Sequence, residues 1–298
     1  MEKIKQLLGP MRVPFLILTP ACVLLGVGTA MWVHNQVNIF QAILVLIGAV
    51  SAHISVNAFN EYFDFQSGLD LKTERTPFSG GSGTLPEKPG LAPSALNIAI
   101  TTFVLTALVG MYFMYVQGLA LLPLGILGLI IIYVYTKWIT QYPLLCLLAP
   151  GLGFGPLMVM GTHFSLTGAY SWTPLIASLI PFFLVSNLLL LNQFPDIEPD
   201  KKVGRKHLPI AAGRKNSVYI FGLFFVLTYL VIIVGVYFAY LPTASLIGLL
   251  TIVIAIPTTM GAFRYAEDIK KLVPYMGLNV VINIITPILV ATGLFIGW

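Results

Sequence analysis

The chain has 298 residues, of which 57% are hydrophobic and only 9% are charged, against roughly 25% in an ordinary soluble domain. The few polar side chains cannot cover the surface of a soluble protein of this length. The composition therefore excludes a soluble enzyme and favours a protein that crosses a membrane several times. The formal net charge is +5, and we expect no nucleic-acid partner.

Nine apolar runs are long enough to cross a membrane as helices. In chain order they are residues 14–33, 41–62, 93–115, 118–136, 144–162, 173–194, 217–239, 243–263 and 275–297. The sequence therefore predicts an all-α fold, a polytopic membrane helical bundle of about nine helices that forms one transmembrane domain over residues 1–298. The N-terminal segment lacks the pattern of a cleaved signal peptide, so we expect the first run to remain as a span.

Charged residues fall only on alternate sides of these runs. All 16 basic residues precede the first run or follow the second, fourth, sixth and eighth runs. Because lysine and arginine mark cytoplasmic loops, we predict a cytoplasmic N-terminus, with Trp298 outside, in a multi-pass protein of the cytoplasmic (inner) membrane. All 11 acidic residues lie on the same side, although acids contribute little to orientation. We therefore expect that side to use carboxylates and cations together.

The two longest connections, at residues 63–92 and 195–216, follow two copies of one motif. "NEYFD" (Asn60 to Asp64) and "NQFPD" (Asn192 to Asp196) share the pattern Asn-x-x-x-Asp, and each closes an even-numbered run. Residues four apart lie on one face of a helix. Since even-numbered runs end at the same side of a membrane, we expect both motifs to build one site.

Carboxylate and amide oxygens at a membrane boundary suit Mg²⁺, which usually takes one or two carboxylates and completes its shell with phosphate oxygens and water. The neighbouring Lys and Arg side chains could bind the outer oxygens of a phosphate group. Solvated acids at helix ends are the alternative interpretation. The doubled motif favours a metal–phosphate site.

The pattern "NEYFDFQSGLD" with the later "NQFPDIEPDKKVGRK" resembles the UbiA superfamily of intramembrane prenyltransferases, and the layout of nine runs extends this resemblance over nearly the whole chain. The segments "MRVPFLILTPACVLLGVG", "YTKW" and "GFGPLMVMGTHF" resemble the branch that prenylates 1,4-dihydroxy-2-naphthoate in menaquinone synthesis. Glu61 stands where many relatives have Asp, and Gly68 stands where the benzoate-type enzymes carry an acid. The stretch "RTPFSGGSGTLP" also differs from the best-known naphthoate enzymes.

The resemblance implies Mg²⁺-dependent transfer of a polyprenyl group from a polyprenyl diphosphate donor to an aromatic acceptor, within membrane lipid. The implied metal ligands are Asn60, Asp64, Asp70, Asn192, Asp196 and Asp200. The implied diphosphate-binding residues are Arg12, Lys72, Lys137, Lys201 and Lys202. Among these, Asp64, Asp196 and Lys137 are expected to act directly in catalysis.

Aromatic side chains near the motifs could shield an allylic cation with their ring faces. The candidates are Tyr62, Phe63, Tyr133 and Tyr135, for each of which simple packing is the alternative. His53 lies two helical turns before Asn60 and so near its face, where it could assist the acceptor or be a hydrogen-bonded core histidine. His207, in the second basic connection, is expected to be solvated.

Other functions stay open from the sequence. An ion-coupled transporter would use the acids for ion coupling, but transporters tend to place ionisable residues near the midplane. A lipid-binding subunit would explain the basic loops and leave the acids unexplained. Within the enzyme reading, 4-hydroxybenzoate, homogentisate, chlorophyllide and glycerol-lipid acceptors are alternatives.

Overall fold

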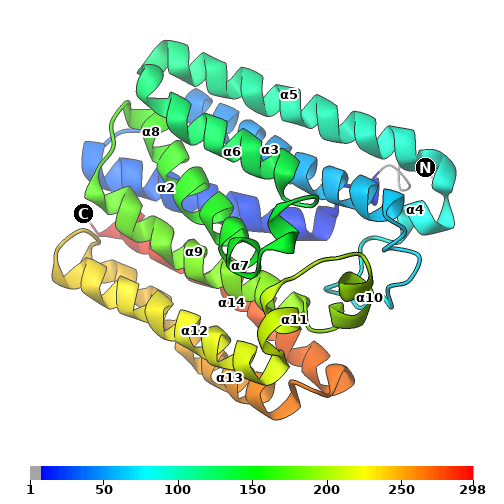
Figure 1. Ribbon diagram of the computed structural model, residues 1–298. Coiled ribbons are helices and arrows are strands. Elements are labelled where there is room, and N and C mark those ends of the chain that lie inside the picture. The colour runs from blue at the N-terminus through cyan, green and yellow to red at the C-terminus, as the bar shows by residue number, and fades with distance from the viewer. Residues whose placement is uncertain (1–7, 298) are drawn as a thin grey trace.

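A computed structural model describes residues 8–297, which form helices joined by turns and contain no strand (Figure 1). Glu2, Lys3, Lys5 and Trp298, which entered the topology prediction, lie outside the described residues. Over the described part of the chain, the prediction of an all-helical membrane fold is confirmed.

Eight helical stretches are long and apolar enough to cross a membrane. Their elements are η1 (Val13–Ile17) with α2 (Leu18–His34), α3 (Ile39–Gln66), η2 (Pro89–Leu91) with α5 (Ala92–Gln117), α7 (Pro143–Leu152) with the π-helix η5 (Gly153–Met160) and α8 (Gly161–Thr167), α9 (Trp172–Asn192), α12 (Arg214–Tyr237), η6 (Thr243–Thr251) with α13 (Ile252–Tyr265), and α14 (Ile269–Ile296). The remaining expected span is the shorter apolar helix Leu119–Val134, made of η3 (Leu119–Leu121) and α6 (Leu122–Val134). At 1.5 Å per residue it is about 24 Å long, less than the ~30 Å hydrocarbon core.

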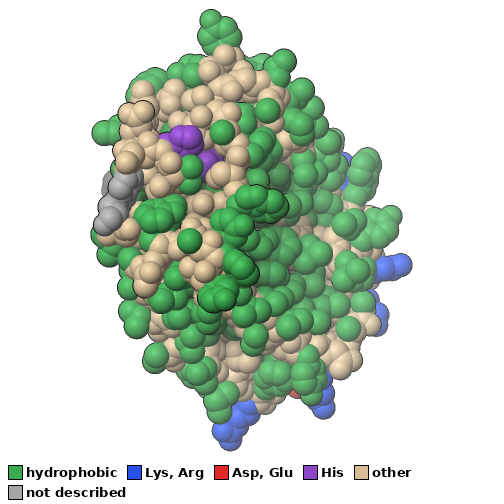
Figure 2. Space-filling model, turned by 90° about the vertical axis from the view of Figure 1, so that its left-hand side faces the viewer, with side chains coloured by type: hydrophobic (Ala, Val, Ile, Leu, Met, Phe, Trp, Pro, Cys, Tyr) green, Lys and Arg blue, Asp and Glu red, His purple; other side chains and the backbone are tan. Residues whose placement is uncertain are grey.

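Successive long helices run in opposite directions, as Figure 1 shows. The short helices α4 (Thr84–Glu87), η4 (Ile139–Gln141), α10 (Ile197–Lys202) and α11 (Leu208–Ala212) lie in connections between them. The connections at residues 67–91 and 193–213 meet at the end that carries α4, α10 and α11, here called the charged end. Every charged residue of the described chain belongs to this end, because each lies in its connections or in the adjoining helical turns. Figure 2 shows the opposite end, where hydrophobic and uncharged surface prevails and Lys and Arg show only at the rim.

The helix boundaries follow from local sequence. The Asn38 side chain accepts a hydrogen bond from the Gln41 backbone N–H at 3.2 Å and caps the start of α3. Asn35 (φ 67°) ends α2, and Gly168 (φ 72°) ends α8, both in the left-handed conformation typical of helix C-termini. These stops leave short turns at the end of the bundle away from the charged residues.

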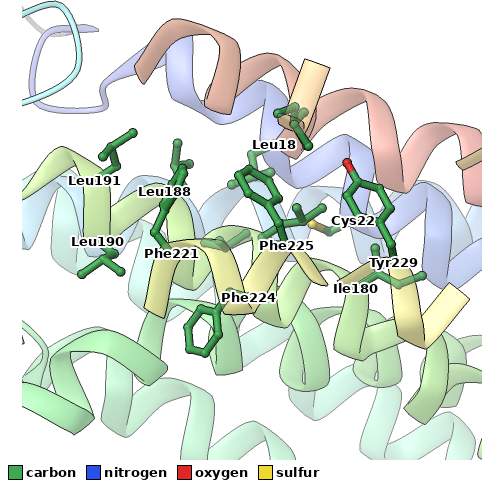
Figure 3. Packing of buried hydrophobic residues seen from close by; sticks show 14 of the residues in the cluster. Leu18, Cys22, Ile180, Leu188, Leu190, Leu191, Phe221, Phe224, Phe225 and Tyr229 are labelled. Carbon is green, nitrogen blue, oxygen red and sulfur yellow. The ribbon is translucent and has the colours of Figure 1, made fainter. Parts of the chain in front are cut away.

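The main core joins α2, α9, α12, α13 and α14. Figure 3 shows Cys22 of α2, Ile180 of α9 and Phe221 and Phe225 of α12 converging in it. Small residues let helices approach closely in membranes, and a Cβ on Gly155 of η5 would lie only 2.4 Å from a backbone oxygen of α9. This close packing holds η5 against α9.

Candidate functional site

A cavity of about 700 Å³ begins among charged side chains at the charged end and continues into the apolar interior. Its polar wall is formed by Arg12, Asn60, Asp64, Asp70, Asn192, Asp196, Asp200, Arg205 and His207. Val45 lines its deep part, and at 1.5 Å per residue Val45 and Asp64 stand about 28 Å apart along α3. The cavity therefore has a charged mouth and an apolar interior that extends across most of the ~30 Å hydrocarbon core.

All six residues proposed as metal ligands line this cavity. Asn60 and Asp64 lie in the last two turns of α3, and Asn192 is the last residue of α9. The chain then turns into α10, whose N-terminal boundary is Asp196, and the Asp200 backbone N–H donates to the Asp196 carbonyl oxygen at 2.9 Å. The structure thus brings the two Asn-x-x-x-Asp motifs to one place.

Arg205, to which the sequence assigned no role, joins the first motif to Asp200, which lies four residues after the second motif. Its guanidinium donates to the Asp64 carboxylate and, at 3.0 Å, to Asp200 Oδ1. Burial lowers the pKa of Arg205, but the Asp64 and Asp200 carboxylates raise it more, so the pKa stands above its ordinary value. Gly204 (φ 84°) turns the chain after α10, and the Arg205 backbone N–H then bonds back to the Asp200 carbonyl oxygen at 3.1 Å. The glycine in "KKVGRK" is the sequence feature from which this turn could have been predicted.

His207 is also at the site, and the expectation that it is solvated was wrong. Its side chain is only 1% exposed, and its Nε2 lies 3.2 Å from Asp200 Oδ2. The cause is local: the Lys206 backbone N–H bonds to the Thr140 carbonyl oxygen at 2.9 Å, and α11 starts at Leu208. These contacts carry the end of the basic connection into the bundle.

Arg12 approaches the first motif from the start of η1. Its Nε donates to Glu61 Oε1 at 2.7 Å, and its Nη2 donates to Asn60 Oδ1 at 2.8 Å. Glu61 has no exposed surface and also accepts hydrogen bonds from the Ser82 backbone N–H and hydroxyl, both at 2.7 Å. Glu61 itself is not part of the cavity wall, unlike Arg12 and Asn60.

Three further side-chain oxygens at the site have the chemistry that a hard cation prefers. Asp70 Oδ2, Asn192 Oδ1 and Asp196 Oδ1 are buried and have no hydrogen-bond partner among residues 8–297. Burial, together with neighbouring carboxylates, raises the pKa of Asp70 and of Asp196 to about 7. In the described part of the chain, no three His, Cys, Asp or Glu side chains converge on one point. A Mg²⁺ ion here would therefore need amide and ligand oxygens as well as carboxylates, which is how Mg²⁺ sites beside phosphates are built.

The other sequence candidates divide between the cavity and the surface. Lys72, Lys137, Lys201 and Lys202 are exposed and do not line the cavity. The Lys137 ammonium lies 4.3 Å from the centre of the Phe63 ring, on the outer side of α3. Tyr62 and Tyr133 also lie outside the cavity wall, and Tyr133 packs against Phe59 with ring centres 5.7 Å apart. Neither tyrosine is placed to shield a cation within the cavity.

Tyr135 and His53 do line the cavity. His53 Nδ1 lies 2.8 Å from the Thr19 hydroxyl, and its ring meets the Phe154 ring edge-on with centres 4.8 Å apart. The histidine is thus held in one orientation by α2 and η5. His53 is therefore hydrogen-bonded, as expected of a core histidine, and it also faces the cavity, as expected of a residue that assists the acceptor.

Comparison with known proteins agrees with this architecture. Residues 20–285 match the UbiA prenyltransferase family. The 1,4-dihydroxy-2-naphthoate octaprenyltransferase of Bacillus subtilis (strain 168) is 31% identical over 211 residues, which cover 70% of this chain and 66% of that relative, slightly under two thirds of its length.

Solved structures share the fold. The apo structure of a UbiA homolog from Aeropyrum pernix K1 has a TM-score of 0.71 at 19% identity, covering 94% of this chain and 97% of that chain. A UbiA homolog from Archaeoglobus fulgidus bound to DMAPP and Mg²⁺ has a TM-score of 0.61 at 17% identity, covering 96% and 99%. The family match over most of the chain and the shared fold lead to one conclusion: this chain belongs to the UbiA prenyltransferase family.

Proposed function

We propose that this protein transfers a polyprenyl group from a prenyl diphosphate to an aromatic acceptor inside the membrane, with Mg²⁺ as cofactor. The observation that carries the proposal is the meeting of two acidic motifs at the mouth of a deep apolar cavity. A prenyl diphosphate has the same two parts, an anionic head and an apolar tail. The charged mouth suits the head, and the interior lined by Val45, Val109 and Leu121 suits the tail.

The mouth offers groups of both charges for this head. Asn60, Asp64, Asp70, Asn192, Asp196 and Asp200 would hold the cation, which supplies positive charge to the diphosphate as the allylic C–O bond breaks. Arg12 and Arg205 both line the cavity and carry fixed positive charge, so they bind the head and stabilise the charge that develops on the leaving group. The four predicted lysines stand outside and would act on the diphosphate only at longer range.

The interior serves the carbon chemistry. Its apolar wall excludes water from the allylic carbon, which favours attack by the acceptor ring over hydrolysis. Tyr135 presents an aromatic side chain in the same cavity, close enough to the mouth to face the allylic end of the donor. His53, oriented by Thr19, offers a ring nitrogen for a hydroxyl of the acceptor.

For the acceptor we propose 1,4-dihydroxy-2-naphthoate, as in menaquinone synthesis. The support is the similarity to the Bacillus subtilis 1,4-dihydroxy-2-naphthoate octaprenyltransferase. For the orientation we propose that the charged end faces the cytoplasm, because every basic residue of the described chain lies there. This places the site where a phosphorylated substrate reaches it from the cytoplasm.

The test is a product assay on the purified full-length protein. The protein is incubated with Mg²⁺, farnesyl or geranylgeranyl diphosphate and each member of a panel of aromatic acceptors, and products are identified by mass spectrometry. The proposal expects a prenylated product that has lost carbon dioxide when the acceptor is 1,4-dihydroxy-2-naphthoate. If 4-hydroxybenzoate were the only acceptor to be prenylated, giving a product that keeps its carboxylate, the naphthoate assignment would be overturned. Prenyl transfer to none of the acceptors would overturn the function.

A further inference from the structure

The acid that follows Asn60 has an environment unlike that of the other acids. Glu61 has no exposed surface and does not line the cavity, whereas Asn60 beside it and Asp64 one turn later do. Its side-chain hydrogen bonds are all made with Arg12 and Ser82. A cation bound among the cavity oxygens would therefore not reach Glu61 directly.

What Glu61 holds is a short piece of the first long connection, residues 79–83, here called the glycine segment. Its sequence is Ser-Gly-Gly-Ser-Gly, and Gly80, Gly81 and Gly83 all have positive φ, which glycine adopts without strain. Ser79, Gly80 and Gly81 line the cavity mouth. A Cβ on Gly81 would lie 3.2 Å from Glu61 Oε1 and 3.3 Å from Asp70 Oδ1, so the segment rests closely on both carboxyl groups.

The same carboxylate holds Arg12. Glu61 Oε1 accepts from Arg12 Nε and from the Ser82 backbone N–H, each at 2.7 Å, and Oε2 accepts from the Ser82 hydroxyl at 2.7 Å. One buried side chain thereby ties the start of the first span to the glycine segment, across the end of α3. Three hydrogen bonds to a buried carboxylate form a rigid unit, because hydrogen bonds to charged groups are strong where water is excluded.

The length of the side chain matters for this arrangement. A carboxylate on a glutamate stands one methylene further from the backbone than one on an aspartate. At this place the glutamate carboxylate meets both Arg12 and Ser82.

We infer that Glu61 is a positioning residue for donor binding: it holds Arg12 in the cavity wall and holds the glycine segment over the mouth, without touching the metal or the substrate. This inference rests on the proposed function for its substrate, a prenyl diphosphate. Its structural part, that Glu61 keeps the glycine segment in place, holds independently of the reaction.

The experiment compares Glu61→Gln and Ser82→Ala with Glu74→Gln, which alters an exposed acid of the same connection that forms no ion pair or side-chain hydrogen bond within residues 8–297. Backbone hydrogen exchange of residues 76–83 is measured by mass spectrometry on the full-length protein. We expect exchange to be about tenfold or more faster in Glu61→Gln, the effect of losing a buried charge-assisted hydrogen bond, and unchanged in Glu74→Gln. Unchanged exchange in Glu61→Gln would overturn the inference whatever the protein catalyses.

Kinetics separate positioning from metal binding. In Glu61→Gln we expect the KM for the prenyl diphosphate to rise about tenfold while kcat falls less than about threefold and the acceptor KM stays constant. The double variant with Ser82→Ala should cost less than the sum of the single variants, because both remove one shared set of contacts. A fall in kcat at constant donor KM would instead make Glu61 part of the catalytic machinery and overturn the inference. Strict additivity with Ser82→Ala would show that Glu61 does not act through Ser82 and would overturn it as well.

Discussion

The guanidinium of Arg205 lies against the carboxylate of Asp64, although 141 residues separate them in the chain. The same guanidinium bonds to Asp200 at 3.0 Å, so one cation spans the ends of α3 and α10. The Arg205 side chain is 15% exposed and the two carboxylates are 8% and 5% exposed. Because few waters reach this group, its electrostatic interactions are stronger than those of surface ion pairs.

Arg205→Gln should therefore weaken both the fold and the reaction. Removing one member of a buried ion pair leaves the other charges unpaired, which typically costs roughly 3 to 5 kcal/mol. We expect a lower melting temperature in detergent and a loss of turnover of at least about a hundredfold, the size seen when one electrostatic stabiliser is removed. The matched control is Lys215→Gln, which changes an exposed lysine of the charged end that forms no ion pair in the described part of the chain. Equal melting temperatures for the two variants would contradict the structural role of Arg205.

Asp196→Asn and Asp64→Asn should abolish Mg²⁺-dependent turnover while the protein still inserts and folds. The amide keeps the size of each side chain but removes the negative charge that a hard cation requires. Glu198→Gln is the control, because Glu198 is an exposed acid on α10, two residues after Asp196. The measurement is product formation over a range of Mg²⁺ concentrations, with size-exclusion profiles to verify folding. Wild-type turnover in purified Asp64→Asn protein would refute the metal assignment.

The pH dependence follows from Asp70 and Asp196, whose pKa values are raised from 3.8 to about 7 by burial and then by neighbouring carboxylates. Between those two values the folded protein binds more protons than the unfolded chain, so its stability falls as pH rises through the window. Turnover should show the opposite trend, because a deprotonated carboxylate can bind the cation. We expect the melting temperature without Mg²⁺ to fall as pH rises from about 4 to about 7, and the rate to rise most steeply around a pH of about 7.

The variant Asp196→Asn tests whether this carboxyl group causes the change of melting temperature with pH. This variant lacks one of the titrating groups, so its melting temperature without Mg²⁺ should change less with pH than that of the wild-type protein. Added Mg²⁺ should raise the melting temperature of the wild-type protein more at high pH than at low pH, since protons compete with the cation. A melting temperature that rises with pH in the absence of Mg²⁺ would show that these carboxyls are not the dominant titrating groups.

The meeting of the two motifs at one end of the bundle could be predicted from the sequence, because it depends only on the number of helices between them. Helices that cross a membrane in turn end on alternate sides, so two motifs that close even-numbered runs, such as those at Asn60 and Asn192, must reach the same end of the bundle. The prediction was imperfect for the run at 118–136, because its helix, Leu119–Val134, is shorter than each of the eight helical stretches that are long enough to cross a membrane. Hydropathy detects an apolar stretch and does not show where a turn shortens the helix.

The orientation of individual side chains could not be predicted in the same way. Arg205 and Lys202 lie three residues apart in one basic stretch, yet Arg205 lines the cavity and Lys202 is exposed. The difference comes from the turn at Gly204 and from backbone bonds to Asp200, which the one-dimensional pattern does not contain. The contacts of Glu61 could not be predicted either, because its partner Ser82 lies in a connection without regular periodicity.

The π-helix η5 offers a test of how the cavity wall is held in place. A Cβ added to Gly155 would lie 2.4 Å from the Ser178 carbonyl oxygen and 2.8 Å from the Phe182 backbone nitrogen, both in α9 and neither free to move alone. Gly155→Ala must therefore push η5 away from α9, at a cost of about 1 to 3 kcal/mol. In Gly110→Ala the added Cβ meets nothing within 4 Å, so this change within α5 should leave the melting temperature unchanged or raise it.

The displacement should also affect the reaction, because η5 carries Phe154, whose ring holds His53 at the cavity wall. We expect Gly155→Ala to raise the KM for the aromatic acceptor through His53, and also the KM for the prenyl diphosphate, because Leu157 and Met158 of η5 line the apolar part of the cavity. Initial rates measured while each substrate is varied in turn would separate the two constants. If Gly155→Ala melts at the wild-type temperature, the close contact between η5 and α9 is not present in the folded protein.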